Sequence, residues 1–111
     1  MSIWFVSRHP GARAWALERE LKVDHWCDHL DITQVVEGDV VIGTLPLPIA
    51  VAVCRCGAEY WHLAIELPAE LRGVELSANE LSRLQARLVR YDLSPCRIVA
   101  LDDSPPPRQQ S

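Results

Sequence analysis

The chain has 111 residues, of which 49% are hydrophobic and 23% charged, and its formal net charge is −4 at neutral pH. This length suits one domain with a single core, and the composition is that of a globular protein. The negative charge argues against duplex nucleic acid as a partner, because such binding needs clustered lysines and arginines. No apolar stretch is long enough to span a membrane and no signal peptide is visible, so we expect a cytoplasmic protein with four reduced cysteines.

The first half of the chain predicts alternating strands and helices. Residues 3–6 are an apolar run typical of a strand covered on both faces. Pro10 is expected to open a helix whose apolar face includes Ala14, Leu17 and Leu21. The further elements expected here are a strand within residues 23–30, a turn at residues 37–39, a strand at residues 40–42 and a buried helix at residues 49–56 that ends at Gly57.

The second half begins with an expected strand at residues 60–67. Ser77 and Glu80 have the spacing of a capping box, and leucines at helical spacing follow them, so a helix is predicted from residue 78 to residue 91. A last strand is expected at residues 97–101. We expect residues 1–103 to form the domain, and the proline-rich residues 104–111 to be disordered because they carry little apolar surface.

This order of elements predicts the fold class. Strands that alternate with helices at this spacing pair in parallel through right-handed crossovers. We therefore expect an α/β fold, a single small Rossmann-like domain with a mostly parallel sheet and helices on both faces. In such sheets a ligand binds beyond the carboxyl ends of the strands.

The first of these strand ends carries three polar residues, Ser7, Arg8 and His9, followed by Pro10 and Gly11. Arg8 supplies a fixed cation, His9 a group that exchanges protons near neutral pH, and Ser7 a hydroxyl. The helix that follows offers free backbone amides, and Gly11 allows a ligand to approach the backbone. The pattern predicts an anion site, although a solvated surface turn explains the same residues.

A second candidate strand end is formed by Gly43, Thr44 and Leu45, and a later loop contributes Arg72. Gly43 and Thr44 offer a permissive backbone and a hydroxyl. The loop of Arg72 follows a predicted strand and could add positive charge at the same edge, although a solvated loop explains it as well. Neither GxxxxGK[ST] nor GxGxxG is present, so a Walker-type NTPase or an ordinary dinucleotide fold is not the leading interpretation.

Histidines elsewhere have alternative interpretations. His25 and His29 lie among three aspartates, Asp24, Asp28 and Asp31, and this set could bind zinc or manganese, although the glutamate of HExxH is missing. We favour polar residues at a strand edge over a metal site. His62 lies in an apolar strand and is expected to be a hydrogen-bonded core residue, and the four tryptophans are expected to belong mainly to the core.

Four segments together resemble a known family: FVSRHPGA, VDHWCDHLD, GDVVIGTLPLPIAVAVCRCGAEYWHLAIELP and RGVELSANELSRLQARL. From residue 3 to about residue 91 the chain is similar to a small family of CRISPR-associated accessory proteins of type III systems. That family in turn resembles the CRISPR-associated Rossmann-fold (CARF-like) ring nucleases, which cut cyclic oligoadenylate second messengers and switch the antiviral response off.

The resemblance implies a function and its residues. Ser7, Arg8 and His9 would be catalytic, and Pro10, Gly11, Gly43, Thr44, Leu45 and Arg72 would bind the ligand. The ring, expected to be cyclic tetra-adenylate, would be cut by attack of its own 2′-hydroxyl, with no metal or other cofactor, in a homodimer that matches its symmetry. The alternatives are a sensor that binds the ring without cutting it and a metal-dependent hydrolase that uses His25, His29 and Asp28.

Overall fold

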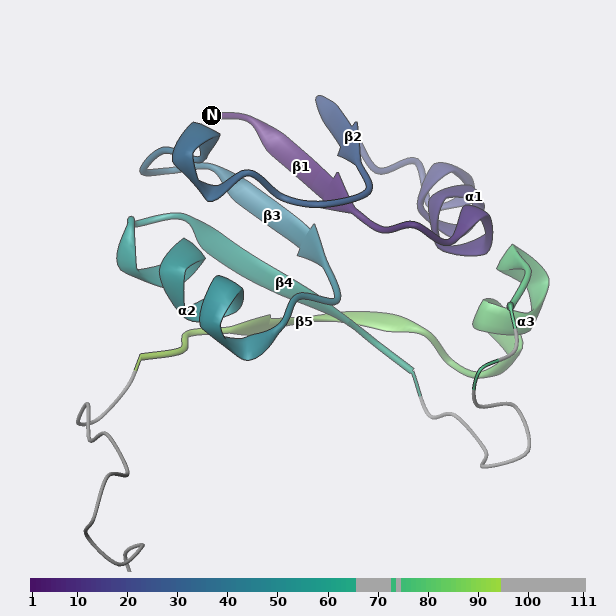
Figure 1. The fold of residues 1–111 in the computed structure, drawn as a ribbon. Helices are drawn as coiled ribbons and strands as arrows, with labels where there is room; N and C mark the ends of the chain where they lie inside the picture. Colours follow the sequence, from purple (N-terminus) through teal and green to yellow (C-terminus); the bar gives the residue numbers. More distant parts are fainter. Residues whose placement is uncertain (66–72, 74, 95–111) are drawn as a thin grey trace, which may run out of the picture.

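The computed structural model describes residues 1–65, 73 and 75–94. The elements, in chain order, are β1 (Ile3–Val6), α1 (Pro10–Glu18), β2 (His25–Cys27), the 3₁₀ helix η1 (Ile32–Gln34), β3 (Val40–Gly43), α2 (Leu47–Arg55), β4 (Glu59–Ala64), α3 (Ala78–Arg83) and β5 (Arg87–Tyr91) (Figure 1). This alternation confirms the predicted α/β class. None of the helices described is long and apolar enough to cross a membrane.

The five strands form one sheet in the order β2-β1-β3-β4-β5. β1 pairs in parallel with both β2 and β3, and β3 pairs in parallel with β4. β5 runs antiparallel to β4. The sheet is therefore mostly parallel, as predicted, and the carboxyl ends of β1, β2, β3 and β4 lie along one edge.

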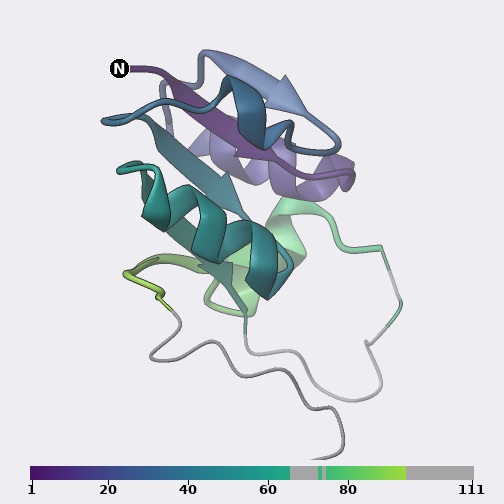
Figure 2. The ribbon, with the colours of Figure 1, turned by 60° about the vertical axis from the view of Figure 1, so that its left-hand side comes forward.

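Helices cover both faces of this sheet, as predicted (Figure 2). Alternate residues of β1 enter two separate hydrophobic clusters, Phe5 on one side and Trp4 and Val6 on the other. Phe5 packs with residues of α1 and α3. Trp4 and Val6 share their cluster with Ala50 and Val53 of α2. Because both faces of the sheet are covered by apolar side chains, the central strands are continuously apolar and do not alternate with polar residues.

The predicted apolar face of α1 was wrong at Leu17, which is 63% exposed. Ala14 and Leu21 pack half-buried against the α1 and α3 cluster as expected, whereas its fully buried members from α1 are Ala12, Trp15 and Ala16. The buried set has the same i, i+3, i+4 spacing as a helix face, but it is rotated toward the small residues. Small side chains let α1 lie close to the sheet, and Trp15 fills the space beyond them.

The predicted strand within residues 23–30 is shorter than expected, because β2 spans only His25–Cys27. It pairs with Trp4, Phe5 and Val6, so the four-residue β1 limits the length of the ladder.

The prediction of a helix over residues 78–91 was right at its start and wrong about its length. The capping box is confirmed: Ser77 Oγ accepts from the Glu80 amide at 3.2 Å, and Glu80 Oε1 accepts from the Ser77 amide at 3.2 Å. The helix ends at Arg83, the backbone turns at Gln85 with φ 57°, and residues 87–91 form β5. Hydrogen bonds to the free edge of β4 outweigh the helical spacing of Leu84 and Leu88.

Several predicted features lie outside the described residues. These are residues 66 and 67 of the strand predicted at 60–67, which ends at Ala64 in the structure, the last strand at residues 97–101 and the tail at residues 104–111. Cys96 also falls there, while the three cysteines that are described, Cys27, Cys54 and Cys56, are free thiols.

Gly11 is where α1 meets the segment before α3, and its replacement by alanine should destabilise the fold. A Cβ at Gly11 would lie 1.7 Å from the backbone oxygen of Leu76. Helix propensity alone would make alanine stabilising here. The clash with the backbone outweighs that gain, and the substitution should lower the free energy of unfolding by about 2 kcal/mol. Urea unfolding of Gly11→Ala tests this, with Glu18→Ala on the exposed side of α1 as control. Unfolding midpoints that are equal to the wild type in both variants would contradict the packing described here.

Candidate functional site

The turn after β1 holds the residues of the first predicted site. The Ser7 amide donates to the Cys27 carbonyl at 2.9 Å, which continues the pairing of β1 with β2. Ser7 Oγ accepts from the His9 amide at 3.1 Å, so the hydroxyl shapes the turn. The Arg8 and His9 side chains are exposed. The backbone therefore holds the turn while two basic side chains face solvent.

Arg13 is a residue of this site that the sequence analysis did not single out. Its Nε and Nη2 donate to the Ser7 carbonyl at 3.2 and 2.9 Å, and Nη2 also pairs with Asp28 at the end of β2. Helical side chains point back toward the helix amino terminus, and this direction was the available signal. Because Asp28 neutralises Arg13, Arg8 is the arginine of this turn without an ion pair among residues 1–65, 73 and 75–94.

The second predicted segment lies beside the first. Val6 and Gly43 are register partners in β1 and β3, so the Ser7 turn and Thr44 leave the sheet at adjacent points of the same edge. A Cβ at Gly43 would lie 2.3 Å from the Val6 carbonyl oxygen, which explains the glycine. Thr44 is exposed. The topology thus brings together Ser7, Arg8, His9 and Thr44 along the ligand edge expected of this fold.

Other predicted ligand contacts differ from expectation. The Cα of Gly11 faces the Leu76 carbonyl, so this glycine accommodates the chain itself. The Ala12 and Arg13 amides both donate to the His9 carbonyl, and Pro10 has no amide hydrogen, so α1 offers fewer free donors than predicted. Recognition of an anion here depends on side chains. Arg72 lies outside the described residues.

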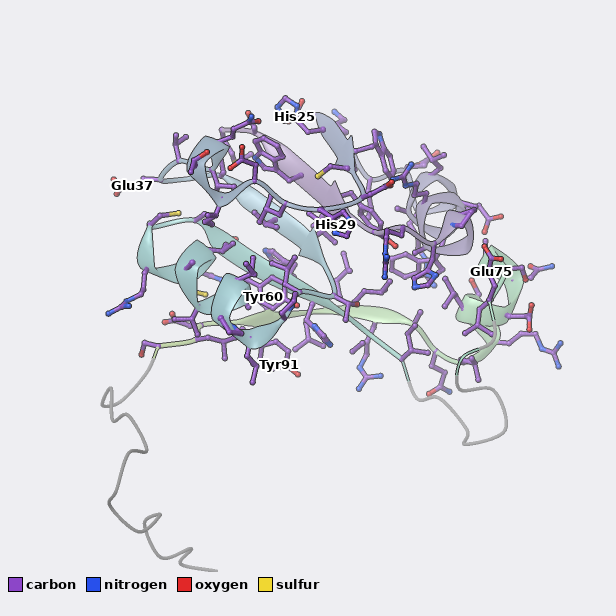
Figure 3. All side chains as sticks on the ribbon, viewed as in Figure 1. His25, His29, Glu37, Tyr60, Glu75 and Tyr91 are labelled. Atoms are coloured by element: carbon purple, nitrogen blue, oxygen red, sulfur yellow. The ribbon has the colours of Figure 1, made fainter. Side chains whose placement is uncertain are left out.

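The residues of the alternative metal site are separated in the structure. His25 stacks on Trp4 with ring centroids 4.2 Å apart, Asp28 pairs with Arg13, and Asp31 accepts from the Thr33 amide at 3.1 Å. Figure 3 shows His25 and His29 well apart. In the part of the chain that the structure describes, no three His, Cys, Asp or Glu side chains are grouped to hold a metal ion.

His62 is hydrogen-bonded, as predicted, but it is half-buried and does not belong to the core. Its Nδ1 lies 2.6 Å from the Tyr60 hydroxyl. The same hydroxyl accepts from the Leu45 amide at 3.1 Å, so it also holds the segment that follows β3. Burial lowers the pKa of His62 and raises the pKa of Tyr60, and both groups are therefore neutral at pH 7.

The fold and this edge define an α/β domain with a small basic surface at the carboxyl ends of parallel strands. The model of one protein family matches residues 4–94, and that family is described as "Putative CRISPR-associated protein (Cas_VVA1548)". The chain belongs to this family of CRISPR-associated proteins. No curated protein and no solved structure matches the chain.

Proposed function

We propose that the protein is a ring nuclease that cleaves cyclic tetra-adenylate and so ends type III CRISPR antiviral signalling. The observation that carries this proposal is the exposed pair Arg8 and His9, held beside Thr44 at the carboxyl edge of the sheet. Membership of a CRISPR-associated family supports a substrate from that defence system. The full chain has a net charge of −4, so a phosphate ligand is attracted locally by these basic side chains.

The proposed reaction uses a nucleophile that belongs to the substrate. A ribose 2′-oxygen attacks the adjacent phosphorus, the bond from phosphorus to the 5′-oxygen breaks, and the products carry a 2′,3′-cyclic phosphate and a 5′-hydroxyl. Holding the 2′-oxygen in line with the leaving oxygen supplies roughly 7 kcal/mol of the barrier reduction. In this scheme Arg8 stabilises the charge that develops on the phosphoryl oxygens. His9 takes the proton from the 2′-hydroxyl or delivers one to the 5′-oxygen.

A homodimer belongs to the proposal. Cyclic tetra-adenylate has rotational symmetry, and a two-fold dimer would present two copies of the Ser7 turn to it. Two turns would supply two Arg8 side chains to opposite phosphates.

Incubation of excess protein with cyclic tetra-adenylate in EDTA, followed by chromatography and mass spectrometry, tests the activity. Linear products with a 2′,3′-cyclic phosphate are expected, because the reaction needs no metal-bound water. A ring that is bound but stays intact would select the second candidate, a sensor or sequestering protein. Cleavage that requires added metal would contradict the proposed chemistry.

Replacing His9 by alanine tests whether this side chain moves a proton. If it does, His9→Ala slows cleavage about 100-fold while the Kd for the ring stays within about twofold. His25→Ala, which removes another exposed histidine at the amino end of β2 and hence away from the Ser7 turn, is the matched control and should leave both quantities unchanged. A cleavage rate in His9→Ala equal to that of the wild type would mean that positioning alone accounts for the reaction.

A further inference from the structure

A cavity of about 300 Å³ lies between α2, β4 and the end of β5. It opens beside the segment that follows β3, and Leu45 of that segment is one of its lining residues. Its lining residues are Leu45, Leu47, Ala50, Tyr60, His62, Tyr91 and Leu93. Figure 3 shows Tyr60 and Tyr91 close to each other beside α2. The volume is at the lower end of the range for small-molecule sites, roughly 300 Å³ and above.

The walls of this cavity suit a flat, mostly apolar group. Leu47 and Ala50 line the α2 side, and aromatic rings line the sheet side. The rings of His62 and Tyr91 are 5.7 Å apart at an interplanar angle of 60°. Leu47 is 70% exposed and Tyr91 is 42% exposed, so the cavity is open to a ligand from solvent. Exposed apolar side chains around a hollow are typical of a binding site.

The hydrogen bonds assign one polar group of the cavity. The Tyr60 oxygen accepts from the Leu45 amide at 3.1 Å, and it lies 2.6 Å from His62 Nδ1 and 3.3 Å from the Gly43 carbonyl oxygen. Tyr60 thus occupies Nδ1 of His62, and Nε2 has no hydrogen-bond partner among residues 1–65, 73 and 75–94. Nε2 donates in one tautomer of the neutral ring and accepts in the other. The cavity therefore offers one polar ring nitrogen on an otherwise apolar wall.

From this geometry we infer that the cavity is a subsite for an adenine base, with His62 Nε2 hydrogen-bonded to the edge of the purine. The inference rests on the proposed function, since it names where one base of the ring is held. An adenine base is flat, stacks on aromatic and leucine side chains, and carries ring nitrogens that accept hydrogen bonds. A base beside Leu45 would place its nucleotide's phosphate near Thr44 at the strand edge.

Titration of the ¹⁵N-labelled full chain with 5′-AMP tests the subsite without requiring cleavage. We expect AMP to shift the amide signals of the cavity residues Leu45, Ala50, Tyr60, His62 and Tyr91. Ribose 5-phosphate, which lacks the base, is the control and should shift signals of the Ser7 turn alone. Equal shifts of the cavity signals with both compounds, or no shift of these signals with AMP, would overturn the inference.

A pair of leucine variants tests whether the same subsite contributes to KM for cyclic tetra-adenylate. Leu47→Ala removes part of the cavity wall and should raise KM for cyclic tetra-adenylate about tenfold. Leu17→Ala removes an equally exposed leucine from the other nine-residue helix and should leave KM unchanged. Cleavage by Leu47→Ala with an unchanged KM would refute the subsite and leave the nuclease proposal standing. AMP shifts at the cavity in a protein that never cuts the ring would support the subsite and refute the nuclease proposal.

Discussion

Arg8→Ala is expected to slow cleavage of cyclic tetra-adenylate about 100-fold, which corresponds to about 3 kcal/mol of lost transition-state stabilisation. Arg8 is exposed at the end of β1, and Asp28 neutralises the neighbouring Arg13 instead. The guanidinium of Arg8 is thus available to a phosphate. Without it, the charge that develops on the phosphoryl oxygens in the transition state loses this stabilisation. Single-turnover rates measured with excess enzyme report this step directly.

The matched control for this prediction is Arg55→Ala. Arg55 is also exposed, but it lies in the last turn of α2, which leads back to the amino end of β4 and hence away from the Ser7 turn. Its removal should change the rate less than about twofold, because charges beyond a Debye length are screened. Equal rate losses in the two variants would mean that general attraction of the ring, not contact at the Ser7 turn, explains the effect of Arg8.

Asp39→Ala is expected to lower the free energy of unfolding by about 3 kcal/mol at pH 7, because buried donors lose a charged acceptor. Asp39 is only 2% exposed. Its carboxylate accepts from the amides of Ser2 at 2.9 Å and Val36 at 3.1 Å and from Trp4 Nε1 at 3.2 Å. These contacts join the amino ends of β1 and β3, opposite the candidate site. Urea unfolding measures the loss, and ring cleavage by the folded fraction should be unaffected.

The same carboxylate should make stability fall with acid. Hydrogen bonds from the Ser2 amide, then the Val36 amide, lower the pKa of Asp39 from its ordinary value of 3.8. A lowered folded-state pKa gives stability that is fully present above the unfolded value and is lost as the pH falls through the folded one. The difference between wild type and Asp39→Asn should therefore shrink from pH 7 toward pH 2. Asp92→Asn, at an exposed carboxylate, is the control, and a difference for Asp39→Asn that is independent of pH would contradict this role.

Much of the fold follows from local patterns in the sequence. Apolar runs with turn residues after them predicted β1 and β3, and the α2 helix ends, as expected, before Gly57 with φ +88°. The capping box at Ser77 was also predicted from spacing alone. The length of α3 was not, because leucines at positions 81, 84 and 88 have helical spacing while residues 87–91 pair with β4. Edge pairing is a property of the folded sheet, and no local pattern shows it.

The candidate site was predictable only in part. Ser7, Arg8 and His9 were found because their polarity interrupts an apolar strand, and sheet topology placed Thr44 beside them. The bond from Arg13 to the Ser7 carbonyl depends on how α1 folds back against the strand end. The cavity at His62 is assembled from α2, β4 and the segment after β5, which are far apart in sequence. Contacts of this kind become visible in three dimensions alone.

The proposed function requires that this chain cuts cyclic tetra-adenylate through the ring's own 2′-hydroxyl. The most direct measurement compares the natural ring with a ring methylated at every 2′-oxygen, each incubated with excess protein in EDTA. We expect linear products with a 2′,3′-cyclic phosphate from the natural ring, and an intact methylated ring. Persistence of the natural ring, or equal cleavage of both rings, would contradict the proposed function.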